Sequence, residues 1–362
     1  MKFVHIADMH FDSPFVNLSD KDGLGDLRRL EQRKVFKKVI DYIKENNIKY
    51  LFISGDLYEQ KYIKKSTIEY INNLFKEIPE TRIFISPGNH DPYTKNSYYN
   101  KFYWNENVKI FTSKIEKIEC EDVNIYGFGF DDFYCKNCGI ENVELEDKNK
   151  LNILVIHGTL DGGAIENSEY NPLSSKLLKE KGFDYVALGH IHKLDYNQEE
   201  NQHIVYPGST VSLGFDELGE HGMIVGELDK ENINLEFFPL DEIEFKLFDL
   251  DVTEIISKEE LIEKINELNF DENNLIEIIL TGKRNFEIDR YELYKLISND
   301  KVIKIKNKTK INYDLEKLAN DTTLKGLFAK EMLEKLRDEN ISEEQREIVE
   351  KAIEIGMEAI GI

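Results

Sequence analysis

Short apolar runs that alternate with stretches of helical periodicity most restrict the fold of this 362-residue chain. Phe3–Ala7, Tyr50–Ser54 and Arg82–Ser86 have the length and composition of buried strands. Between them, residues 27–46 and 66–77 repeat apolar side chains at helical spacing. Strands that alternate with helices in this way predict a layered α/β fold.

The rest of the chain divides into three expected parts. More strands are expected at 124–127, 152–156 and 185–188, followed by hairpin-like strands at 204–206, 223–228 and 234–238. Near Asp241 the pattern changes. We therefore expect a first domain at 1–240, a small α+β domain at 241–313 and a helical segment at 314–362. Lys301–Ile311 alternates lysine with apolar residues and predicts one half-exposed strand.

Charge and cysteine content limit the classes of function. The chain has 70 acidic and 47 basic residues, a net charge of −23, so it should bind nucleic acid poorly without local attraction. The three cysteines, Cys120, Cys135 and Cys138, do not suggest a disulfide framework. The opening residues are typical of a strand, and no stretch has the length of a membrane span. We expect a soluble, cytoplasmic protein with no membrane partner.

Polar side chains gather where the expected strands end, and five of the eight histidines are among them. In chain order these residues are Asp8 and His10, then Asp56, then Asn89, His90 and Asp91, then His157, and finally His190 and His192. Each group alone could be a turn or a surface pair. The carboxyl ends of strands in an open α/β sheet form a ligand-binding crevice, so together they predict one site.

Imidazole, carboxylate and amide oxygen ligands suit a mid-row divalent metal better than magnesium or calcium. One aspartate can bridge two ions about 3.5–4 Å apart. We therefore expect two divalent ions, manganese first, with iron, zinc and nickel as alternatives. Such a centre stays net positive and attracts phosphate. A bridging hydroxide would then attack phosphorus while a protonated histidine assists the leaving oxygen.

The five blocks resemble the signature of calcineurin-like metallophosphoesterases, from Met1 to about Leu240. The resemblance implies a layered α/β/β/α sandwich, here with a smaller α+β capping domain and C-terminal helices. It implies that one ion is held by Asp8, His10, Asp56 and His192, and the other by Asp56, Asn89, His157 and His190. It also implies that His90 is catalytic, and we place Glu59 and Asp91 beside it as catalytic candidates.

Two stretches are similar to the DNA repair exonuclease branch of this family, which includes the SbcD and YhaO proteins. They are the opening His5–Phe15, and Tyr206–Thr210 together with Gly214–Glu217. The resemblance implies a manganese-dependent exonuclease or endonuclease that acts on DNA ends or single strands. Serine/threonine phosphatases of the family carry an arginine after the second block, and Gly55–Glu59 lacks it.

Glu59 departs from the branch, whose nucleases often carry a histidine at this position. A carboxylate here can orient His90 and raise its basicity. Equally, Glu59 can be a solvated loop residue. The change favours a YhaO-like over an SbcD-like protein and puts double-strand exonuclease activity in doubt.

Two groups of lysines are candidate DNA contacts. The first is Lys61, Lys64 and Lys65, and the second is Lys304, Lys306 and Lys308, which continues to Lys310. The second group can instead protect a solvated edge strand from aggregation. The aromatic residues at 93–104 fit a base-stacking platform, a homodimer contact or ordinary packing.

The helical segment after Leu324 carries more apolar surface than a tail needs. The resemblance implies docking on an SMC-like ABC ATPase, SbcC-like, while packing on the chain's own second domain is the alternative. Two other functions stay open. One is a phosphodiesterase or phosphatase for a small nucleotide or phosphoprotein, and the other is a scaffold without catalysis. The complete ligand set argues against the scaffold.

Overall fold

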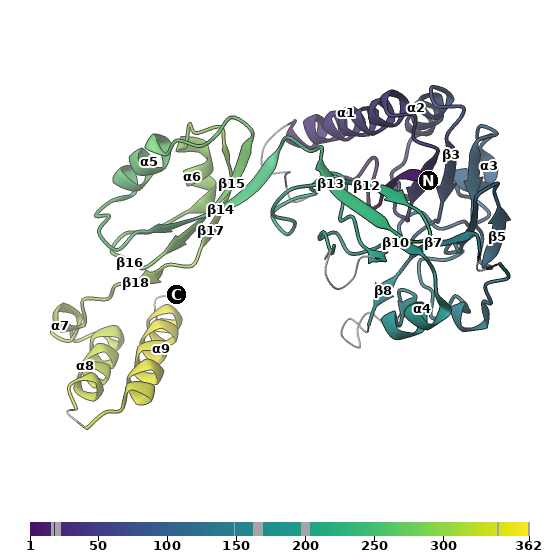
Figure 1. Ribbon diagram of the computed structural model, residues 1–362. Helices are drawn as coiled ribbons and strands as arrows, with labels where there is room; N and C mark the ends of the chain where they lie inside the picture. Colours follow the sequence, from purple (N-terminus) through teal and green to yellow (C-terminus); the bar gives the residue numbers. More distant parts are fainter. Residues whose placement is uncertain are drawn as a thin grey trace. The chain divides into compact units, whose positions relative to one another are not determined.

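The computed structural model describes residues 1–15, 18, 23–147, 149–161, 169–196, 203–338 and 340–360. The chain forms two compact units, Met1–Phe245 and Lys246–Ile362 (Figure 1). Residues 339, 361 and 362 of the expected helical segment lie outside the described residues. No helix within the described ranges combines the length and apolar composition that a membrane span requires.

A six-stranded sheet in the order β13-β12-β1-β2-β3-β4 forms half of the first unit. β1 to β4 are parallel, whereas β12 runs antiparallel to both β1 and β13. The strands are β1 (Lys2–Ile6), β2 (Tyr50–Ile53), β3 (Arg82–Ile85), β4 (Val108–Ile110), β12 (Gly222–Leu228) and β13 (Ile233–Pro239).

A five-stranded sheet in the order β11-β10-β7-β6-β5 forms the other half. β6, β7, β10 and β11 are parallel, and β5 runs antiparallel to β6. The strands are β5 (Glu116–Glu119), β6 (Val123–Gly127), β7 (Leu151–His157), β10 (Tyr185–Gly189) and β11 (Ile204–Val205). Because β11 pairs in parallel with β10, it is not the hairpin strand expected from the sequence.

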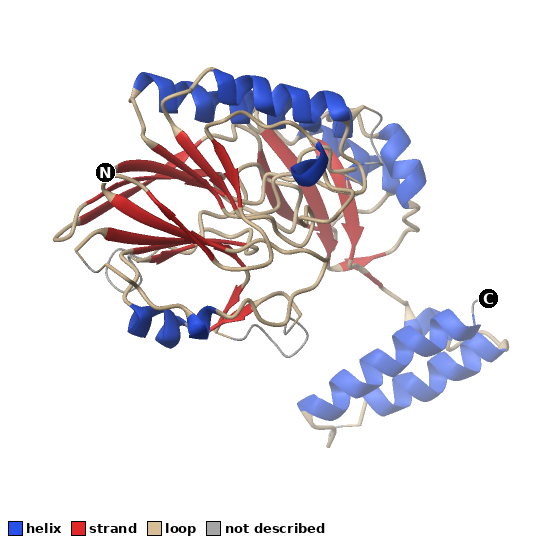
Figure 2. Ribbon diagram, turned by 90° about the vertical axis from the view of Figure 1, so that its right-hand side faces the viewer, coloured by secondary structure: helices blue, strands red, loops and turns tan. Residues whose placement is uncertain are grey.

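Alternating residues of the strands build three layers of core. Val4 of β1 packs with α1 (Leu24–Glu45) and α2 (Lys65–Lys76), whereas the neighbouring Phe3 packs against the second sheet. Leu154 of β7 packs on the other side with Leu178 of α4 (Ser175–Lys181). Helices therefore lie outside both sheets (Figure 2), and the expected α/β/β/α layering is confirmed. The short elements are α3 (Tyr98–Lys101), η2 (Ile140–Asn142), β8 (Thr159–Leu160) and β9 (Pro172–Leu173).

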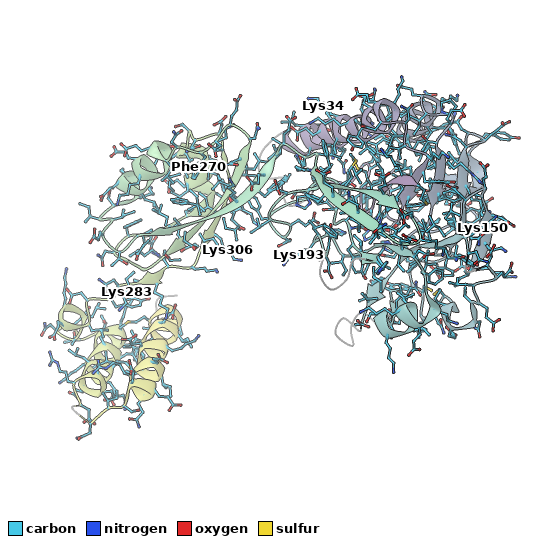
Figure 3. All side chains as sticks on the ribbon, viewed as in Figure 1. Lys34, Lys150, Lys193, Phe270, Lys283 and Lys306 are labelled. Carbon is cyan, nitrogen blue, oxygen red and sulfur yellow. The ribbon has the colours of Figure 1, made fainter. Side chains whose placement is uncertain are left out.

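The second unit contains a three-stranded sheet, β14-β15-β17, and a helical hairpin. Its elements are β14 (Glu244–Asp251), α5 (Lys258–Glu267), β15 (Asn274–Thr281), β16 (Lys283–Arg284), α6 (Arg290–Leu296), β17 (Val302–Asn307), β18 (Lys310–Ile311), α7 (Leu315–Leu318), α8 (Leu324–Leu336) and α9 (Glu343–Ile360). Phe270 and Lys306, labelled in Figure 3, lie in this unit. Ala329, Met332, Ile353 and Met357 form the core of the hairpin.

The single strand expected at Lys301–Ile311 is wrong, because two strands occupy this stretch. The side chain of Asn307 accepts hydrogen bonds from the backbone N–H and the hydroxyl of Thr309, which turns the chain. β17 therefore ends at Asn307, and β18 pairs with β16 instead of continuing beside β15.

Arg28 attaches α1 to the segments that follow β11 and β13. Its buried guanidinium donates two hydrogen bonds to Asp241, of 2.8 and 3.3 Å, and one of 2.8 Å to the carbonyl of Ser212. One turn along α1, Gln32 donates to the carbonyls of Met9 and His10 at 2.9 and 3.0 Å. The Arg28 ion pair therefore also holds the loop that carries His10.

We predict that Arg28→Met destabilises the first unit by about 3–5 kcal/mol, because it leaves the buried Asp241 without its counterion. Arg29→Met, which removes a largely exposed pair with Asp26, should cost less than about 1 kcal/mol. Urea unfolding followed by the fluorescence of Trp104 measures both, since this single tryptophan packs in the first unit. Equal midpoints for the two variants would contradict the prediction.

Candidate metal centre

The loops that follow β1, β2, β3, β7 and β10 bring the expected site residues together. Four of these residues have positive backbone φ, namely Asp8 at 50°, His10 at 47°, Asp56 at 51° and His190 at 106°. Non-glycine residues rarely adopt this conformation, and it persists only where the surrounding structure imposes it. Backbone strain is therefore concentrated at the ends of the strands.

Two glycines allow the loops to approach closely. A Cβ atom on Gly55, whose φ is +93°, would lie 2.2 Å from Nδ1 of His157. A Cβ atom on Gly88 would lie 2.3 Å from Oδ1 of Asp56. Both glycines are therefore required by the packing of the site rather than by the strands themselves.

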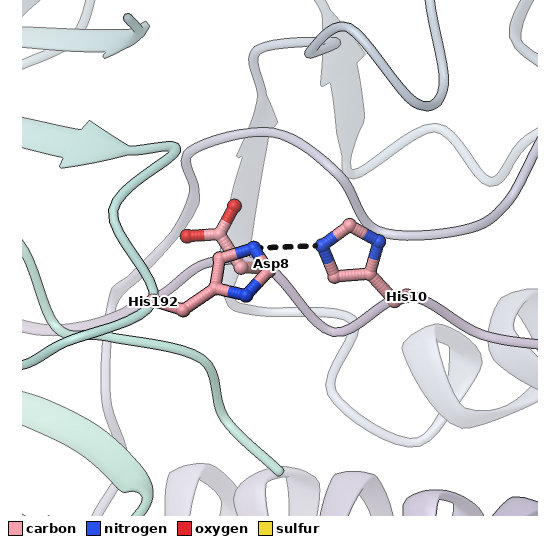
Figure 4. A group of neighbouring side chains, drawn as sticks. All are labelled: Asp8, His10 and His192. Atoms are coloured by element: carbon pink, nitrogen blue, oxygen red, sulfur yellow. Dashed lines mark hydrogen bonds between the residues drawn. The ribbon is translucent and has the colours of Figure 1, made fainter. Parts of the chain in front are cut away.

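Two groups of potential ligand atoms lie side by side. Asp8, His10 and His192 form the first group (Figure 4), and Asp56, His157 and His190 form the second. Oδ2 of Asp56 lies 3.3 Å from Nε2 of His157 and 3.9 Å from Nε2 of His10, so it faces both groups. Oδ1 of Asn89 lies 3.0 Å from Nε2 of His157 and adds an amide oxygen to the second group.

The imidazoles are oriented as metal ligands. Nδ1 of His10 lies 2.8 Å from Glu59, Nδ1 of His157 lies 2.9 Å from the carbonyl of Ser54, and Nδ1 of His192 lies 2.5 Å from Glu217. Because these partners accept hydrogen bonds, each Nδ1 donates, so Nε2 is the nitrogen that can bind a metal ion. Nε2 of His10 and Nε2 of His192 are only 3.1 Å apart (Figure 4). Both nitrogens can bind one cation that lies between them, whether a proton or a metal ion, so the residues present fit a metal ion.

The electrostatics of the buried carboxylates point the same way. Burial alone lowers the pKa of His157, but Asp56 and Asp8 outweigh it and raise this pKa to about 9. For His192, burial is likewise outweighed by the hydrogen bond to Glu217 and by Asp8, and its pKa rises to about 9. The carboxylates therefore stabilise positive charge at these rings, and they would stabilise a bound divalent cation in the same way.

Glu59 contacts both a potential ligand and the catalytic candidate. One oxygen accepts from Nδ1 of His10, and the other lies 3.1 Å from Nδ1 of His90. Its side chain is only 15% exposed, whereas that of His90 is 44% exposed. The geometry therefore matches an orienting carboxylate and not a solvated loop residue. Although burial lowers the pKa of His90, the hydrogen bond to Glu59 and nearby carboxylates raise it to about 9.

Asp91 is fully buried, and its contacts are with the protein itself. It accepts hydrogen bonds from the backbone N–H groups of Asp56 (3.1 Å), Leu57 (2.7 Å) and Gly88 (2.7 Å), and from the hydroxyl of Tyr99 (2.6 Å). A carboxylate held in this way can position the loops that carry Asp56 and Gly88. A catalytic role for Asp91 stays a prediction.

The first lysine group is exposed and follows a residue that is hydrogen-bonded to His90. Lys61, Lys64 and Lys65 are exposed and follow Gln60, whose N–H donates to the carbonyl of His90 at 2.9 Å. Lys65 pairs with Glu69 at 3.1 Å. The aromatic residues at 93–104 mostly pack against the core, although Tyr103 is 95% exposed.

The second lysine group does not form one face. Lys304 is half-buried and lies 3.5 Å from Glu277, whereas Lys306 and Lys308 are exposed. Lys308 follows the end of β17, and Lys310 pairs with Glu354 at 3.7 Å. The alternation in the sequence is interrupted by the turn at Asn307.

A family model for calcineurin-like phosphoesterases matches residues 1–194. The chain belongs to the calcineurin-like phosphoesterase family. The expected resemblance is thereby confirmed, and the His and Asp groups are candidate ligands for the divalent metals that this family binds.

Two curated relatives are similar to this phosphoesterase. It is 27% identical to the uncharacterized metallophosphoesterase YhaO of Bacillus subtilis over 263 residues, which cover 70% of this chain and 64% of YhaO. The match thus spans less than two thirds of YhaO. It is 31% identical to the SbcD subunit of the SbcCD nuclease of Staphylococcus epidermidis over 297 residues, which cover 71% of this chain and 75% of SbcD. The crystal structure of TT1561 of Thermus thermophilus matches with a TM-score of 0.37 and 12% identity, over 65% of this chain and 98% of TT1561.

Sequence reasoning missed Glu217 and Ser54 as supports of this phosphoesterase site. Oε2 of Glu217 accepts from the hydroxyl of Ser209 at 2.8 Å and from the N–H of Leu213 at 3.1 Å, while Oε1 faces His192. Glu217 did stand in the Gly214–Glu217 stretch, but nothing local links it to a histidine 25 residues away. The contact of Ser54 uses its backbone carbonyl, which no residue pattern reveals.

We predict that Asp91→Ala destabilises the first unit by at least about 3 kcal/mol, because it leaves several buried N–H groups without an acceptor. Manganese binding should weaken in parallel, since Asp56 loses its support. Trp104 fluorescence in urea and calorimetric titration with Mn²⁺ measure the two effects. The exposed Asp131→Ala is the matched control and should change neither. Wild-type stability together with lost activity would instead support a catalytic role for Asp91.

Proposed function

We propose that this chain is a two-metal phosphodiesterase, most specifically a manganese-dependent DNA exonuclease or endonuclease of DNA repair. The observation that carries the proposal is the position of Asp56 between two groups of histidines, within 3.3 Å of one imidazole nitrogen and 3.9 Å of the other. This arrangement suits a carboxylate shared by two ions. The likeness to the SbcD subunit of the SbcCD nuclease supports the choice of DNA as substrate.

We assign Asp8, His10, Asp56 and His192 to one ion, and Asp56, Asn89, His157 and His190 to the other. When bound, two divalent ions would neutralise phosphate charge and supply a nucleophile at neutral pH. The chain itself contributes His90. Its Nδ1 is held by Glu59, so Nε2 is the atom that can give a proton to the leaving oxygen.

DNA binding must overcome the net charge of −23, so attraction has to be local. The two bound metal ions and the exposed Lys61, Lys64 and Lys65 beside the His90 loop would supply positive charge where the phosphodiester would lie. We propose these lysines as backbone contacts, with Lys306 and Lys308 of the second unit as weaker candidates. Three free cysteines are consistent with a reducing, cytoplasmic location, which we also propose.

The helical hairpin of the second unit supports a partner. Leu324, Leu327, Ile348 and Ile355 are each about 60% exposed or more, although the hairpin buries its own core. We propose that this apolar surface docks on an SMC-like ABC ATPase, in line with the relative that is a component of SbcCD. A homodimer stays a prediction.

We predict manganese-dependent degradation of labelled linear DNA by the purified chain, with single- and double-stranded substrates compared directly. EDTA should abolish cleavage, and Asp56→Asn should abolish it without unfolding the chain, because the amide keeps the volume of the carboxylate. If the wild-type chain hydrolyses a chromogenic phosphodiester that DNA fails to inhibit, the substrate is a small nucleotide or phosphoprotein. Absence of hydrolysis on every substrate would favour a scaffold.

We predict that His90→Ala lowers turnover by about 10²–10⁴-fold, because a positioned proton donor is lost. The variant should still bind two equivalents of Mn²⁺, which separates catalysis from ligation. The distinction is needed because His90 also lies within reach of His10 and Asp56 as a potential ligand group. Loss of one equivalent of metal in the variant would make His90 a ligand instead.

A further inference from the structure

The two sheets of the first unit meet at a largely apolar interface, in which His5 is fully buried. Phe3 of β1 packs there against Tyr185 of β10 with ring centroids 4.7 Å apart, and His5 lies edge-on to the same tyrosine ring at 5.8 Å. We infer that His5 is a positioning residue that aligns the two sheets at the metal centre through hydrogen bonds across their interface. The inference rests on the proposed two-metal function.

His5 stands in the middle of a chain of hydrogen bonds that joins the two sheets. Nδ1 of His5 lies 2.9 Å from the hydroxyl of Tyr185, and Nε2 lies 3.0 Å from Oγ of Ser54. The hydroxyl of Ser54 donates to the carbonyl of Ala187 at 2.9 Å. Because Ser54 has one hydroxyl hydrogen, its Oγ accepts from Nε2 of His5, which leaves Nδ1 to accept from Tyr185. The chain therefore ties β1 and the end of β2 to β10.

The chemistry of His5 makes this alignment specific. Burial lowers the pKa of His5 to about 3, so its ring is neutral and has one N–H group and one lone pair. Apolar side chains such as Phe3 can pack in several similar arrangements, whereas the hydrogen bonds of His5 form in one. A shift of one sheet along the other would leave buried polar groups without partners, which costs free energy. His5 therefore restricts the two sheets to one alignment.

This alignment affects the metal centre because the potential ligands come from both sheets. Asp56 follows β2 of the six-stranded sheet, whereas His157 ends β7 of the five-stranded sheet. The same Ser54 that accepts from His5 also accepts, through its backbone carbonyl, from Nδ1 of His157 at 2.9 Å. A Cβ atom on Gly189 of β10 would lie 1.8 Å from that carbonyl oxygen, so the sheets approach closely at this point. His5 thus fixes a residue that orients a potential ligand across the interface.

The paired substitution His5→Phe and Tyr185→Phe tests the alignment, because it removes the chain and keeps the interface filled. Ser54 can still donate to Ala187, so the double variant should unfold in urea close to wild type. Formation of a spin-coupled Mn²⁺ pair, followed by electron paramagnetic resonance, should nevertheless require about 10–100-fold more Mn²⁺, the usual effect of losing a residue that positions a ligand. Pairing of Mn²⁺ at wild-type concentrations in the double variant would overturn the inference.

Single substitutions separate positioning from packing. His5→Gln keeps one donor and one acceptor on a smaller side chain, so it should pair Mn²⁺ nearly as well as wild type. Ser54→Ala releases the carbonyl from the chain with little change of volume, and should raise the Mn²⁺ requirement even if the double variant fails to fold. Tyr126→Phe is the matched control, since it removes a buried hydroxyl from the outer side of the five-stranded sheet. Equal defects in Ser54→Ala and Tyr126→Phe, or no rescue by His5→Gln, would refute the role of His5.

These readouts do not depend on nuclease activity, so failure of the inference and failure of the proposed function look different. A wild-type chain that pairs Mn²⁺ but cleaves no DNA would sink the proposed substrate and leave the role of His5 intact. Cleavage of DNA by the wild-type chain, together with unchanged Mn²⁺ pairing in the variants, would sink the role of His5 alone. A wild-type chain that forms no Mn²⁺ pair would overturn both.

Discussion

The hydrogen bonds to the buried carboxylate of Asp91 are the constraint on which the site depends. They join the N–H groups of Asp56 and Leu57, which follow β2, to that of Gly88, which follows β3. The loops of two neighbouring strands are thereby fixed to one anion, and Asp56 is held in its left-handed conformation. The N–H of His90 then donates to Oδ1 of Asp56 at 2.8 Å, which leaves Oδ2 facing the two histidine groups. One internal charge thus sets the position of the carboxylate that both ions would share.

Local patterns in the sequence were sufficient to predict a layered α/β fold and the residues at the strand ends, whereas the α/β/β/α order of the layers came from the resemblance to the family. The buried strands are short apolar runs, and the chemistry-bearing residues follow them within a few positions. Elements with weak local signals were not foreseen. α4 buries only Leu178 and therefore shows little helical periodicity. Lysine and apolar residues alternate throughout Lys301–Ile311, which predicted one strand. The strand nevertheless ends at Asn307, whose side chain accepts a hydrogen bond from Thr309 and turns the chain.

The supports of the site were harder to foresee than its potential ligands. Glu217 reaches His192 across a loop, and Ser54 acts through its carbonyl, so neither contact leaves a trace in residue spacing. Asp91 was recognised as a site residue, but its role depends on burial, which the sequence of a Gly-Asn-His-Asp turn does not reveal. Glu59 was the exception. It was noticed because it departs from the family pattern at a single position. Its contacts with His10 and His90 suit the orienting role that the departure suggested.

The distribution of charge limits how such a site can select its substrate. A chain with a net charge of −23 repels polyanions at long range, and salt weakens that repulsion. Under the proposed function, attraction would come from the bound ions and from the exposed Lys61, Lys64 and Lys65, which follow Gln60 beside the His90 loop. Substrate affinity would then depend on occupancy of the metal positions more than on a broad basic surface. Glu59 contacts both His10, a potential metal ligand, and His90, the proposed proton donor. Under the proposed function, one carboxylate would therefore support both ion binding and proton transfer, and a substitution of Glu59 would alter both.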